Sequence, residues 1–282
     1  MRRVICRISG ELSAIYPENE AKAVAREAVC SVSGMSYTSL LASDVVELTD
    51  RQLEELSSIV GRLKKYEPLQ YVLGCAWFCG RRFAVAPGVL IPRPETEELV
   101  SWVIRAESER GMARRILDIG TGSGCIAVTL ALSIVGVDVD AVDISPEALR
   151  VAESNAASLG ATVKFRRMDI LSAVVPDMPL YDVIVSNPPY VMERERAGME
   201  RNVLDYEPSA ALFVPDDDPL LFYRAIAAYA RGALSAGGAL YFEINGLLGE
   251  ETVQLVSSMG FADVELRRDL DGRPRMLRAI KL

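Results

Sequence analysis

The spacing of hydrophobic residues divides the chain into a helical first part and a second part in which strands and helices alternate. Over the first ~70 residues, apolar side chains recur at helical spacing, as at Ala21, Val24, Ala25, Ala28 and Val29. A second stretch, from about Asp50 to Lys65, repeats this spacing, and Asp50 is its expected N-cap. This part of the chain therefore predicts a small helical bundle.

Residues 71–92 have a different character. Short apolar runs are interrupted there by Gly74, Gly80, Pro87 and Gly88. Such interruptions are typical of a β-hairpin or of a linker with strand character. A helix is expected to follow, with Thr96 as its cap and the carboxylates of Glu97 and Glu98 in its first turn.

From residue 115 onward, apolar runs alternate with helical patterns. The expected strands are 115–120, 137–143, 162–169, 181–187 and 239–245. The expected helices are 124–133, 145–160 (capped by Ser145, with Pro146 first and Gly160 at the end), about 219–234, and 246–260. A long loop is expected after residue 187, and two last strands, 262–269 and 275–282, have no helix between them. The pattern predicts an α/β fold: a parallel sheet covered on both faces, with an antiparallel hairpin at one edge.

Composition narrows the function classes. The net charge of −8 argues against a protein that grips duplex nucleic acid through a basic face. The chain has no histidine, which excludes every histidine-dependent triad, base or metal centre. The five cysteines are irregularly spaced, so we expect neither a disulfide framework nor a zinc site, and no metal. Without a signal sequence or a membrane-length apolar run, a cytoplasmic protein is expected.

A glycine-rich turn follows the first strand of the alternating part. It contains Asp118, Gly120, Thr121, Gly122 and Gly124. Glycines there permit positive φ and let a ligand approach the backbone, at the sheet edge where open α/β folds bind ligands. The spacing is GxGxG rather than GxGxxG, and the anionic Asp118 suits a cofactor with a cationic methionine part better than a pyrophosphate.

Two further carboxylates end the next two strands. Asp143 is placed to accept hydrogen bonds from ribose hydroxyls, as in other adenosine-cofactor folds. Asp169 is placed to accept from an adenine amino group, the alternative being a helix cap or a loop carboxylate.

The most informative motif is Asn187-Pro188-Pro189-Tyr190, at the end of the strand 181–187. An amide nitrogen is a poor nucleophile because its lone pair is delocalised. The side-chain oxygen of Asn187 and the carbonyl of Pro188 can accept both of its N–H bonds and stabilise positive charge as it develops. The prolines fix the backbone, and Tyr190 offers a flat face to a planar group. The motif therefore predicts methyl transfer to a planar amide or amine nitrogen, the alternative being a rigid surface turn.

In these motifs the chain resembles the HemK/PrmC family, methyltransferases that modify the glutamine of peptide chain release factors at N5. The resemblance is clear from about Glu67 to Leu282 and looser before it. Matching stretches are EPLQYVLG (67–74), FAVAPGVLIPRPETEELV (83–100), LDIGTGSGCIA (117–127), AVDISPEAL (141–149), VSNPPYV (185–191), YEPSAALF (206–213) and RDLDGRPRM (268–276).

The resemblance implies a class I methyltransferase, with a seven-stranded Rossmann-like sheet ending in an antiparallel hairpin. It implies a helical substrate-recognition domain at 1–72, a β-hairpin linker at 73–92 and a catalytic domain at 93–282. S-adenosyl-L-methionine is the implied methyl donor, leaving as S-adenosyl-L-homocysteine. The implied acceptor is the glutamine of the GGQ motif in release factors, the proteins of translation termination.

The residues of the expected site follow from the motifs and from this resemblance together. The expected cofactor contacts are Asp118, Gly120, Thr121, Gly122, Gly124, Asp143, Asp169 and Asn187. Asn187, Pro188 and Tyr190 are the expected catalytic residues, and Pro189 is added to them as a substrate contact. In the family, the segment 93–96 borders the cofactor pocket. The resemblance assigns no roles within 192–205.

Three alternatives remain open. DNA methyltransferases that act on adenine N6 or cytosine N4 also use an NPPY-type motif, but they need a DNA-gripping surface that this acidic chain does not predict. A methyltransferase of another protein glutamine is closer in chemistry. A non-catalytic binding module would not need the glycines, Asp143 and the whole of residues 187–190. Oligomeric state, cofactor affinity, the preferred release factor and the docking surface do not follow from the sequence.

Overall fold

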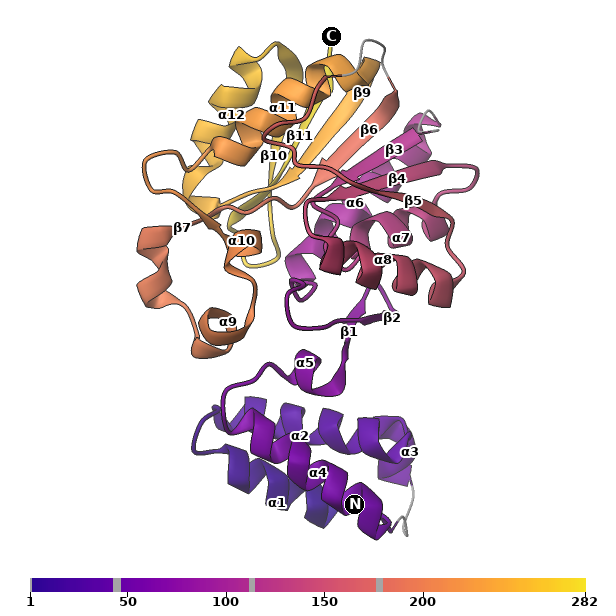
Figure 1. The fold of residues 1–282 in the computed structure, drawn as a ribbon, viewed down its shortest axis with the longest axis vertical. Coiled ribbons are helices and arrows are strands. Elements are labelled where there is room, and N and C mark those ends of the chain that lie inside the picture. Colours follow the sequence, from indigo (N-terminus) through magenta and orange to yellow (C-terminus); the bar gives the residue numbers. More distant parts are fainter. Residues whose placement is uncertain (1, 43–46, 112–114, 176–179) are drawn as a thin grey trace. The chain divides into compact units, whose positions relative to one another are not determined.

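The computed structural model describes residues 2–42, 47–111, 115–175 and 180–282, which form two compact units (Figure 1). The first unit contains residues up to Cys75 together with Glu200–Tyr206. The second contains Ala76–Met199 and Glu207–Leu282. No helix in the described ranges is both long enough and apolar enough to cross a membrane.

The first unit is a helical bundle. Its helices are α1 (Arg2–Leu12), α2 (Glu18–Ser33), α3 (Tyr37–Ala42), α4 (Asp50–Leu63) and α5 (Leu69–Leu73). They enclose a common apolar core that contains Leu12, Val29, Leu56 and Leu63. The predicted cap of α4 is wrong by one residue, because Thr49 rather than Asp50 accepts from the backbone N–H of Gln52 and completes a capping box.

A short helix from much later in the chain belongs to the same unit. In α9 (Arg201–Tyr206), the hydroxyl of Tyr206 donates to the backbone oxygen of Lys65 over 2.8 Å. The guanidinium of Arg201 lies 4.4 Å from the centre of the Tyr66 ring. The helical unit is therefore assembled from two separate stretches of sequence.

The linker prediction for 71–92 is correct in kind but begins too early. Residues up to Leu73 still belong to α5, and the two-stranded sheet consists of β1 (Cys75–Phe78) and β2 (Arg81–Ala84). Cys79 and Gly80 connect the strands with positive φ angles of 47° and 71°. Phe78 and Phe83 are fully buried and contact each other edge to face.

The second unit is built on a seven-stranded sheet in the order β10-β11-β9-β6-β3-β4-β5. The strands are β3 (Arg115–Ile119), β4 (Asp138–Asp143), β5 (Val163–Arg167), β6 (Tyr181–Ser186), β9 (Leu234–Glu243), β10 (Phe261–Arg268) and β11 (Pro274–Lys281). The strands from β9 to β5 are parallel, whereas β11 and β10 run antiparallel. This confirms the predicted class I fold and its C-terminal hairpin.

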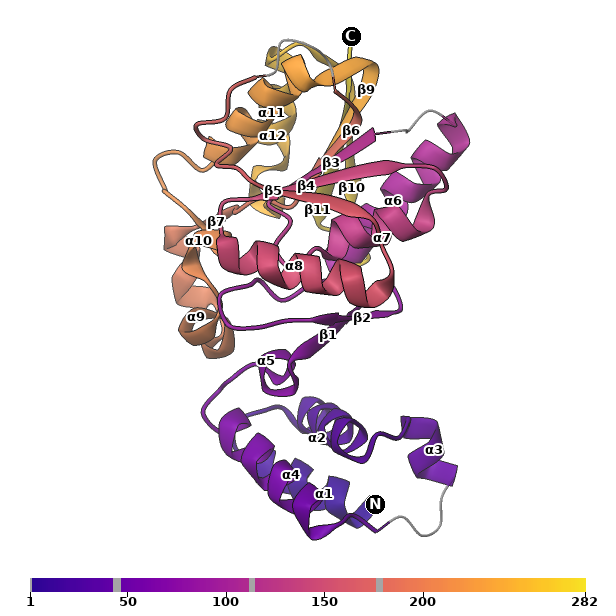
Figure 2. The ribbon, with the colours of Figure 1, turned by 45° about the vertical axis from the view of Figure 1, so that its right-hand side comes forward.

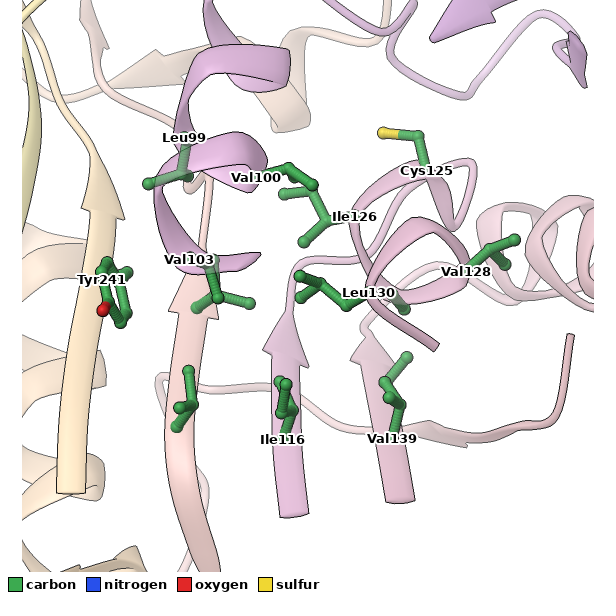
Figure 3. Close-up of a cluster of buried hydrophobic side chains, with 14 of the residues drawn as sticks. Leu99, Val100, Val103, Ile116, Cys125, Ile126, Val128, Leu130, Val139 and Tyr241 are labelled. Atoms are coloured by element: carbon green, nitrogen blue, oxygen red, sulfur yellow. The ribbon is translucent and has the colours of Figure 1, made fainter. Parts of the chain in front are cut away.

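Helices cover both faces of the sheet (Figures 1 and 2). One face packs against α6 (Pro94–Arg110), α7 (Cys125–Ser133) and α8 (Pro146–Leu159), in the core that Figure 3 shows. The other packs against α11 (Leu221–Ala233) and α12 (Gly249–Ser258). Because strand side chains alternate, Ile116 enters the first core and Leu117 the second. Burial on both faces explains why the strands are almost continuously apolar.

Two sequence predictions of local structure in this unit have different outcomes. Ser145 caps α8, Pro146 is its first residue and Gly160 ends it with φ +72°, as expected. Thr96 is not a cap, since α6 already begins at Pro94 after Arg93. The Thr96 side chain is directed instead toward the end of β9, where it donates to Glu243.

The segment between β6 and α11 is more structured than the predicted long loop. It contains β7 (Val191–Met192), a 3-10 helix at Glu193–Gly198, α9, α10 (Ser209–Leu212) and β8 (Phe213–Val214). The short strands β7 and β8 pair in parallel, and Met192 and Val214 form a small apolar cluster. Strands this short carry too little periodic signal to be seen in a sequence.

Asn155 of α8 provides a test of how β2 is held against α8 within the second unit. It is 1% exposed, accepts from the N–H of Ala84 at 2.7 Å, and donates to the backbone oxygens of Ala84 and Ser123 at 3.0 and 2.8 Å. Asn155→Ala removes all three bonds and leaves buried polar groups unpaired. We expect urea unfolding to show a loss of about 1–3 kcal/mol. Ser158→Ala on the same helix, at an exposed site, should change stability by less than about 0.5 kcal/mol; similar losses would contradict the role of Asn155.

Candidate active site

A cavity of about 390 Å³ lies at the carboxyl edge of the parallel strands. Its lining includes a large part of the predicted site: Gly120, Thr121, Gly122, Asp143, Asp169, Asn187, Pro188 and Pro189. Asp118, Gly124 and Tyr190 do not line it. The volume is within the range of small-molecule sites, so the predicted residues meet around a space that a cofactor can fill.

The glycine turn forms one wall of the cavity. Gly120 and Gly122 have φ angles of +75° and +56°, which L side chains rarely adopt. The N–H groups of Gly120 and Thr121 both donate to the carbonyl of Val142, over 2.9 and 3.0 Å. The turn is therefore held against the end of β4, and Gly120 and Gly122 line the cavity with backbone atoms alone.

Gly124 has a different role in the same turn. Its φ is +80°, and a Cβ atom built on it would lie 3.0 Å from the Cβ of Ala152 in α8. The absence of a side chain thus lets α7 begin in close contact with α8. Its predicted cofactor contact has no support in the lining of the cavity and stays a prediction.

Asp118 lies beneath the turn and is completely buried. One carboxylate oxygen accepts from the Thr121 hydroxyl at 2.6 Å and from the Ala127 N–H at 3.2 Å. The other oxygen is buried without a hydrogen-bond partner in the described structure. Burial raises the pKa of Asp118 to about 7, against the effect of its two donors. Asp118 supports the turn from below, and its predicted contact with a cofactor remains a prediction.

Asp143 connects the turn to the next helix. Its two oxygens accept from the N–H groups of Gly122 and Ser145, each over 2.9 Å. Burial raises the pKa of this carboxyl, while these backbone donors oppose the rise. Each carboxylate oxygen has a further lone pair, so Asp143 can also accept from a ligand in the cavity.

Asp169 lies after β5, beside apolar residues of the cavity wall. Its carboxylate accepts from the N–H of Leu171 at 3.0 Å, which is the local loop contact considered as its alternative role. Ile144 and Leu171 line the cavity and are 54% and 47% exposed. Exposed aliphatic side chains beside a carboxylate suit a flat, amine-bearing base, so both roles of Asp169 are compatible with its geometry.

The backbone after β6 is fixed on both sides of the proline pair. Before it, the Ser186 hydroxyl donates to the carbonyl of Ile119 at 2.7 Å. After it, the N–H of Tyr190 donates to Leu212 at 3.2 Å, and Asn245 donates to the Tyr190 carbonyl at 3.0 Å. These bonds anchor the segment that presents Asn187 and the Pro188 carbonyl.

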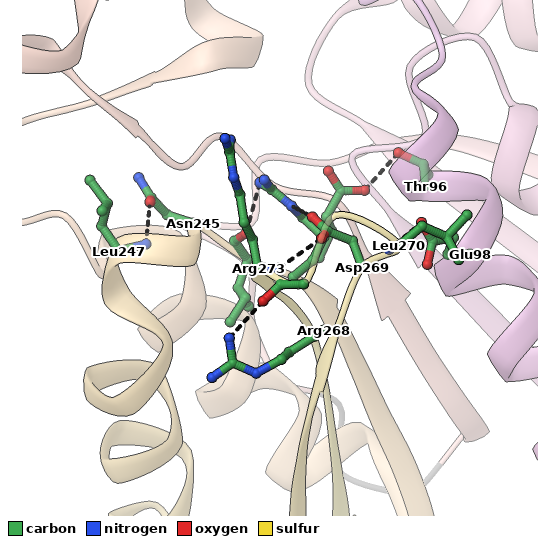
Figure 4. Close-up of polar contacts among 12 residues, drawn as sticks. Thr96, Glu98, Asn245, Leu247, Arg268, Asp269, Leu270 and Arg273 are labelled. Carbon is green, nitrogen blue, oxygen red and sulfur yellow. Dashed lines mark hydrogen bonds and ion pairs between the residues drawn. The ribbon is translucent and has the colours of Figure 1, made fainter.

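Two residues without a predicted role in catalysis hold the side chains of this motif. Asn187 donates from Nδ2 to the Thr96 hydroxyl at 3.1 Å. That hydroxyl, labelled in Figure 4, donates in turn to Glu243 at 2.6 Å. The second oxygen of Glu243 accepts from the Tyr190 hydroxyl at 3.0 Å. Sequence reasoning missed Glu243, although a carboxylate in an otherwise apolar strand is the signal that could have found it.

Glu207 is another residue that sequence reasoning missed. The residue is 6% exposed. Its carboxylate pairs with Arg93 and accepts from the N–H of Ile91 at 3.2 Å. Arg93 and Ile91 belong to one wall of the cavity, and the neighbouring Pro208 belongs to another. Within the family-like segment 93–96, Arg93 and Thr96 line the cavity. Glu207 therefore ties two walls together.

The described cysteines are free, and the described residues contain no group of three or more cysteine, aspartate or glutamate side chains placed to hold a metal.

Asp118 makes a testable contribution to the pH dependence of the free energy of unfolding. Its folded pKa of about 7 lies above the unfolded value of ~3.9. Its contribution to stability is therefore complete below pH ~4 and is lost as the pH rises through about 7, because the folded state holds a proton that the unfolded state has released. Asp118→Asn keeps an oxygen acceptor and cannot ionise.

We expect urea unfolding of the ligand-free chain to show Asp118→Asn gaining about 1–3 kcal/mol relative to wild type between pH ~5 and pH ~8. The variant must first show the wild-type circular dichroism spectrum at both pH values. A difference between the two chains that is independent of pH would mean that the folded pKa of Asp118 is not raised.

Comparisons with known proteins cover both units. Residues 5–74 match the family model of the PrmC N-terminal domain, and residues 98–204 match that of the methyltransferase small domain. The Thermus thermophilus 16S rRNA N2 G1207 methyltransferase, solved with AdoMet and guanosine, aligns with a TM-score of 0.54 and 18% identity over 74% of this chain and 50% of that one. That likeness concerns the fold alone.

Sequence relatives extend over the whole chain. The release factor glutamine methyltransferase of Bacteroides thetaiotaomicron is 47% identical over 279 residues, 99% of each protein. That of Flavobacterium psychrophilum is 40% identical over 269 residues, 95% of this chain and 94% of the relative. The resemblance seen in the motifs is thereby confirmed, and the chain belongs to the family of release factor glutamine methyltransferases.

Proposed function

We propose that this protein transfers a methyl group from S-adenosyl-L-methionine to the side-chain amide nitrogen, N5, of the glutamine in the GGQ motif of peptide chain release factors. The observation that carries the proposal is the anchored segment from Asn187 to Tyr190 at the edge of the cavity, in a chain similar along its length to release factor glutamine methyltransferases. An amide acceptor requires two hydrogen-bond acceptors close together, which is what this segment offers.

The cofactor fits the cavity by the chemistry of its walls. Asp143 would accept from the ribose hydroxyls, and Asp169 from the adenine amino group, between the aliphatic side chains of Ile144 and Leu171. The backbone of Gly120 and Gly122 leaves room for the methionine part. When bound, S-adenosyl-L-methionine supplies an electrophilic methyl group on a sulfonium that is a good leaving group.

The protein's own part in the reaction is to orient the acceptor amide. The side-chain oxygen of Asn187 and the carbonyl oxygen of Pro188 accept hydrogen bonds from the two N–H groups of the glutamine amide. This directs the nitrogen lone pair to the methyl group and stabilises the positive charge that develops as the C–N bond forms. The bond between sulfur and the methyl group would break as the C–N bond forms, and one N–H proton of the nitrogen would then pass to water, so no histidine is needed as a strong base before attack.

The helical unit is proposed to recognise the release factor, as the substrate-recognition domain of residues 1–72. Support comes from the match of residues 5–74 to the PrmC N-terminal domain and from the separate core of this unit. The acidic net charge of −8 gives no support to DNA as the acceptor.

The proposed reaction can be tested with methyl-labelled S-adenosylmethionine and three acceptors. These are a purified release factor, the same factor with its GGQ glutamine replaced by alanine, and duplex DNA. Label on the intact factor alone is the expected result. Label on the replaced factor would move the target to another residue, and label on DNA would support the adenine or cytosine methyltransferase instead.

Asn187→Ala tests the role of the Asn187 side-chain oxygen in binding the glutamine. It removes one of two acceptors for the glutamine N–H groups, so we expect kcat for the release factor to fall by about 100- to 1,000-fold. The thermal unfolding midpoint should stay near that of wild type. Ser158→Ala, at an exposed site of α8 outside the cavity, provides the control. Wild-type turnover by Asn187→Ala would remove the residue from the mechanism.

Asp143→Ala tests cofactor binding. It removes the proposed acceptor of the ribose hydroxyls, and we expect calorimetry to show an affinity for S-adenosylmethionine about 10- to 100-fold lower. The matched control is Asp138→Ala, which lies exposed at the other end of the same strand and should bind as wild type does. Equal affinities of the two variants would take Asp143 out of the cofactor site.

A further inference from the structure

A continuous chain of hydrogen bonds runs through the active-site motif and ends at one buried carboxylate. Asn187 donates to Thr96 over 3.1 Å, and Thr96 donates to Glu243 over 2.6 Å. Tyr190 donates to the other oxygen of Glu243 over 3.0 Å. Glu243 is 1% exposed, so its bonding requirements are met by these side chains rather than by water.

The chemistry of the carboxylate fixes the direction of every bond in this chain. An ionised carboxylate only accepts, so both hydroxyl protons must point toward Glu243. The single proton of the Thr96 hydroxyl is then used, and its oxygen can bind a further neighbour only as an acceptor. The neighbour is the Asn187 side chain, which must therefore present its NH₂ group to Thr96.

Burial raises the pKa of Glu243 overall, and the groups that contact it limit that rise. The negative charge of Glu95 adds to the effect of burial. The hydroxyls of Thr96 and Tyr190 and the positive charge of Arg275 act in the opposite direction. Arg275 is itself held by Asp269 at 3.2 Å and by the carbonyl of Ile244 at 3.4 Å, which keeps its charge next to the end of β9.

We propose that Thr96 and Glu243 are positioning residues that set the rotation of the Asn187 amide and so present its oxygen, rather than its nitrogen, to the acceptor glutamine. This inference rests on the proposed function. No described residue donates a hydrogen bond to the Asn187 oxygen, and Asn187 lines the cavity. If the Asn187 amide were rotated by half a turn, its oxygen would face the Thr96 hydroxyl oxygen with no proton between them. Its NH₂ group would then face the glutamine NH₂, so two donors would meet.

Nothing in the Asn187 side chain itself selects one rotation, because its oxygen and nitrogen ends have nearly the same shape. The selection comes from a residue of α6 and one of β9, which reach the motif from far away in the sequence. The same carboxylate holds the hydroxyl of Tyr190, so the residues on both sides of the proline pair share one anchor.

The test is a double-mutant cycle with Thr96→Val, which keeps the shape of the side chain and removes its hydroxyl, and Asn187→Ala. Single-turnover transfer of labelled methyl to a release factor measures each rate with enzyme in excess. We expect Thr96→Val to slow transfer about 10- to 100-fold when Asn187 is present. In the Asn187→Ala background the same change should have less than about a twofold effect, because Thr96 acts through Asn187.

Thr96→Ser is the matched control, since it keeps the hydroxyl and loses only a methyl group; its rate should be within about threefold of wild type. All rates are measured at saturating S-adenosylmethionine, so that a change in cofactor affinity does not enter the comparison. If Thr96→Val does not fold, Glu243→Gln replaces it in the cycle. That variant has the same shape but carries a donor as well as an acceptor, so it permits both directions of the chain and should slow transfer at least about tenfold.

The outcomes separate this inference from the proposed function. The positioning role would be overturned if Thr96→Val slowed transfer equally with and without the Asn187 side chain, or did not slow it at all. Transfer by the wild-type enzyme in the same assay would still uphold the proposed function. A loss that Thr96→Ser shares would also overturn it, since packing would then be the cause. Absence of transfer to the release factor by wild type would overturn the proposed function and this role together.

Discussion

The register of the parallel strands is the constraint on which the active site depends. Val142 of β4, Ile119 of β3, Ser186 of β6 and Phe242 of β9 stand side by side in one row across the sheet. The residue that follows each of these four in the sequence belongs to the site; these residues are Asp143, Gly120, Asn187 and Glu243. Four segments of chain separated by up to 123 positions are thus brought to one edge by backbone hydrogen bonds alone. A shift of one residue in any pair would move a functional group to the next position and turn it to the other face of the sheet.

This edge also concentrates carboxyl groups, since Asp118, Glu207 and Glu243 are buried at or beneath it and Asp143 is half-buried there. Burial of a carboxylate is unfavourable unless hydrogen bonds replace water. Backbone N–H groups provide these bonds for Asp143, and hydroxyls provide them for Glu243. Each buried carboxylate therefore organises the loop or side chains that donate to it, and stability and site geometry depend on the same contacts.

Much of the fold could be predicted because its determinants are local or periodic. The apolar strands, the cap at Ser145 and the GxGxG turn each lie within a few consecutive residues, and their predicted strands and helices match the observed ones closely. The fold class and the family are confirmed. Among the site residues, the cavity brings together those that end strands, since strand ends can be located from the apolar pattern.

The contacts that were not predicted join distant parts of the sequence. Thr96 looked like a cap because it stands just before a helical pattern, and its true partner is Glu243, 147 positions away. Glu207 and its partner Arg93 are separated by 114 positions. Pairing of α9 with Lys65 and Tyr66 is of the same kind. Local periodicity contains no information on such pairs, and the predicted roles of Asp118, Gly124 and Tyr190 as direct ligand contacts remain predictions.

The packing of α9 with the N-terminal helices has a consequence for how such proteins diverge. Arg201 and Tyr206 contribute to a unit whose other residues end at Cys75. Recombination that exchanged the first 75 residues for those of another lineage would leave Arg201 without its ring wherever the incoming sequence has no aromatic residue at position 66. The helical unit is inherited intact only if α9 is inherited with it, so the two stretches are expected to change in concert during evolution.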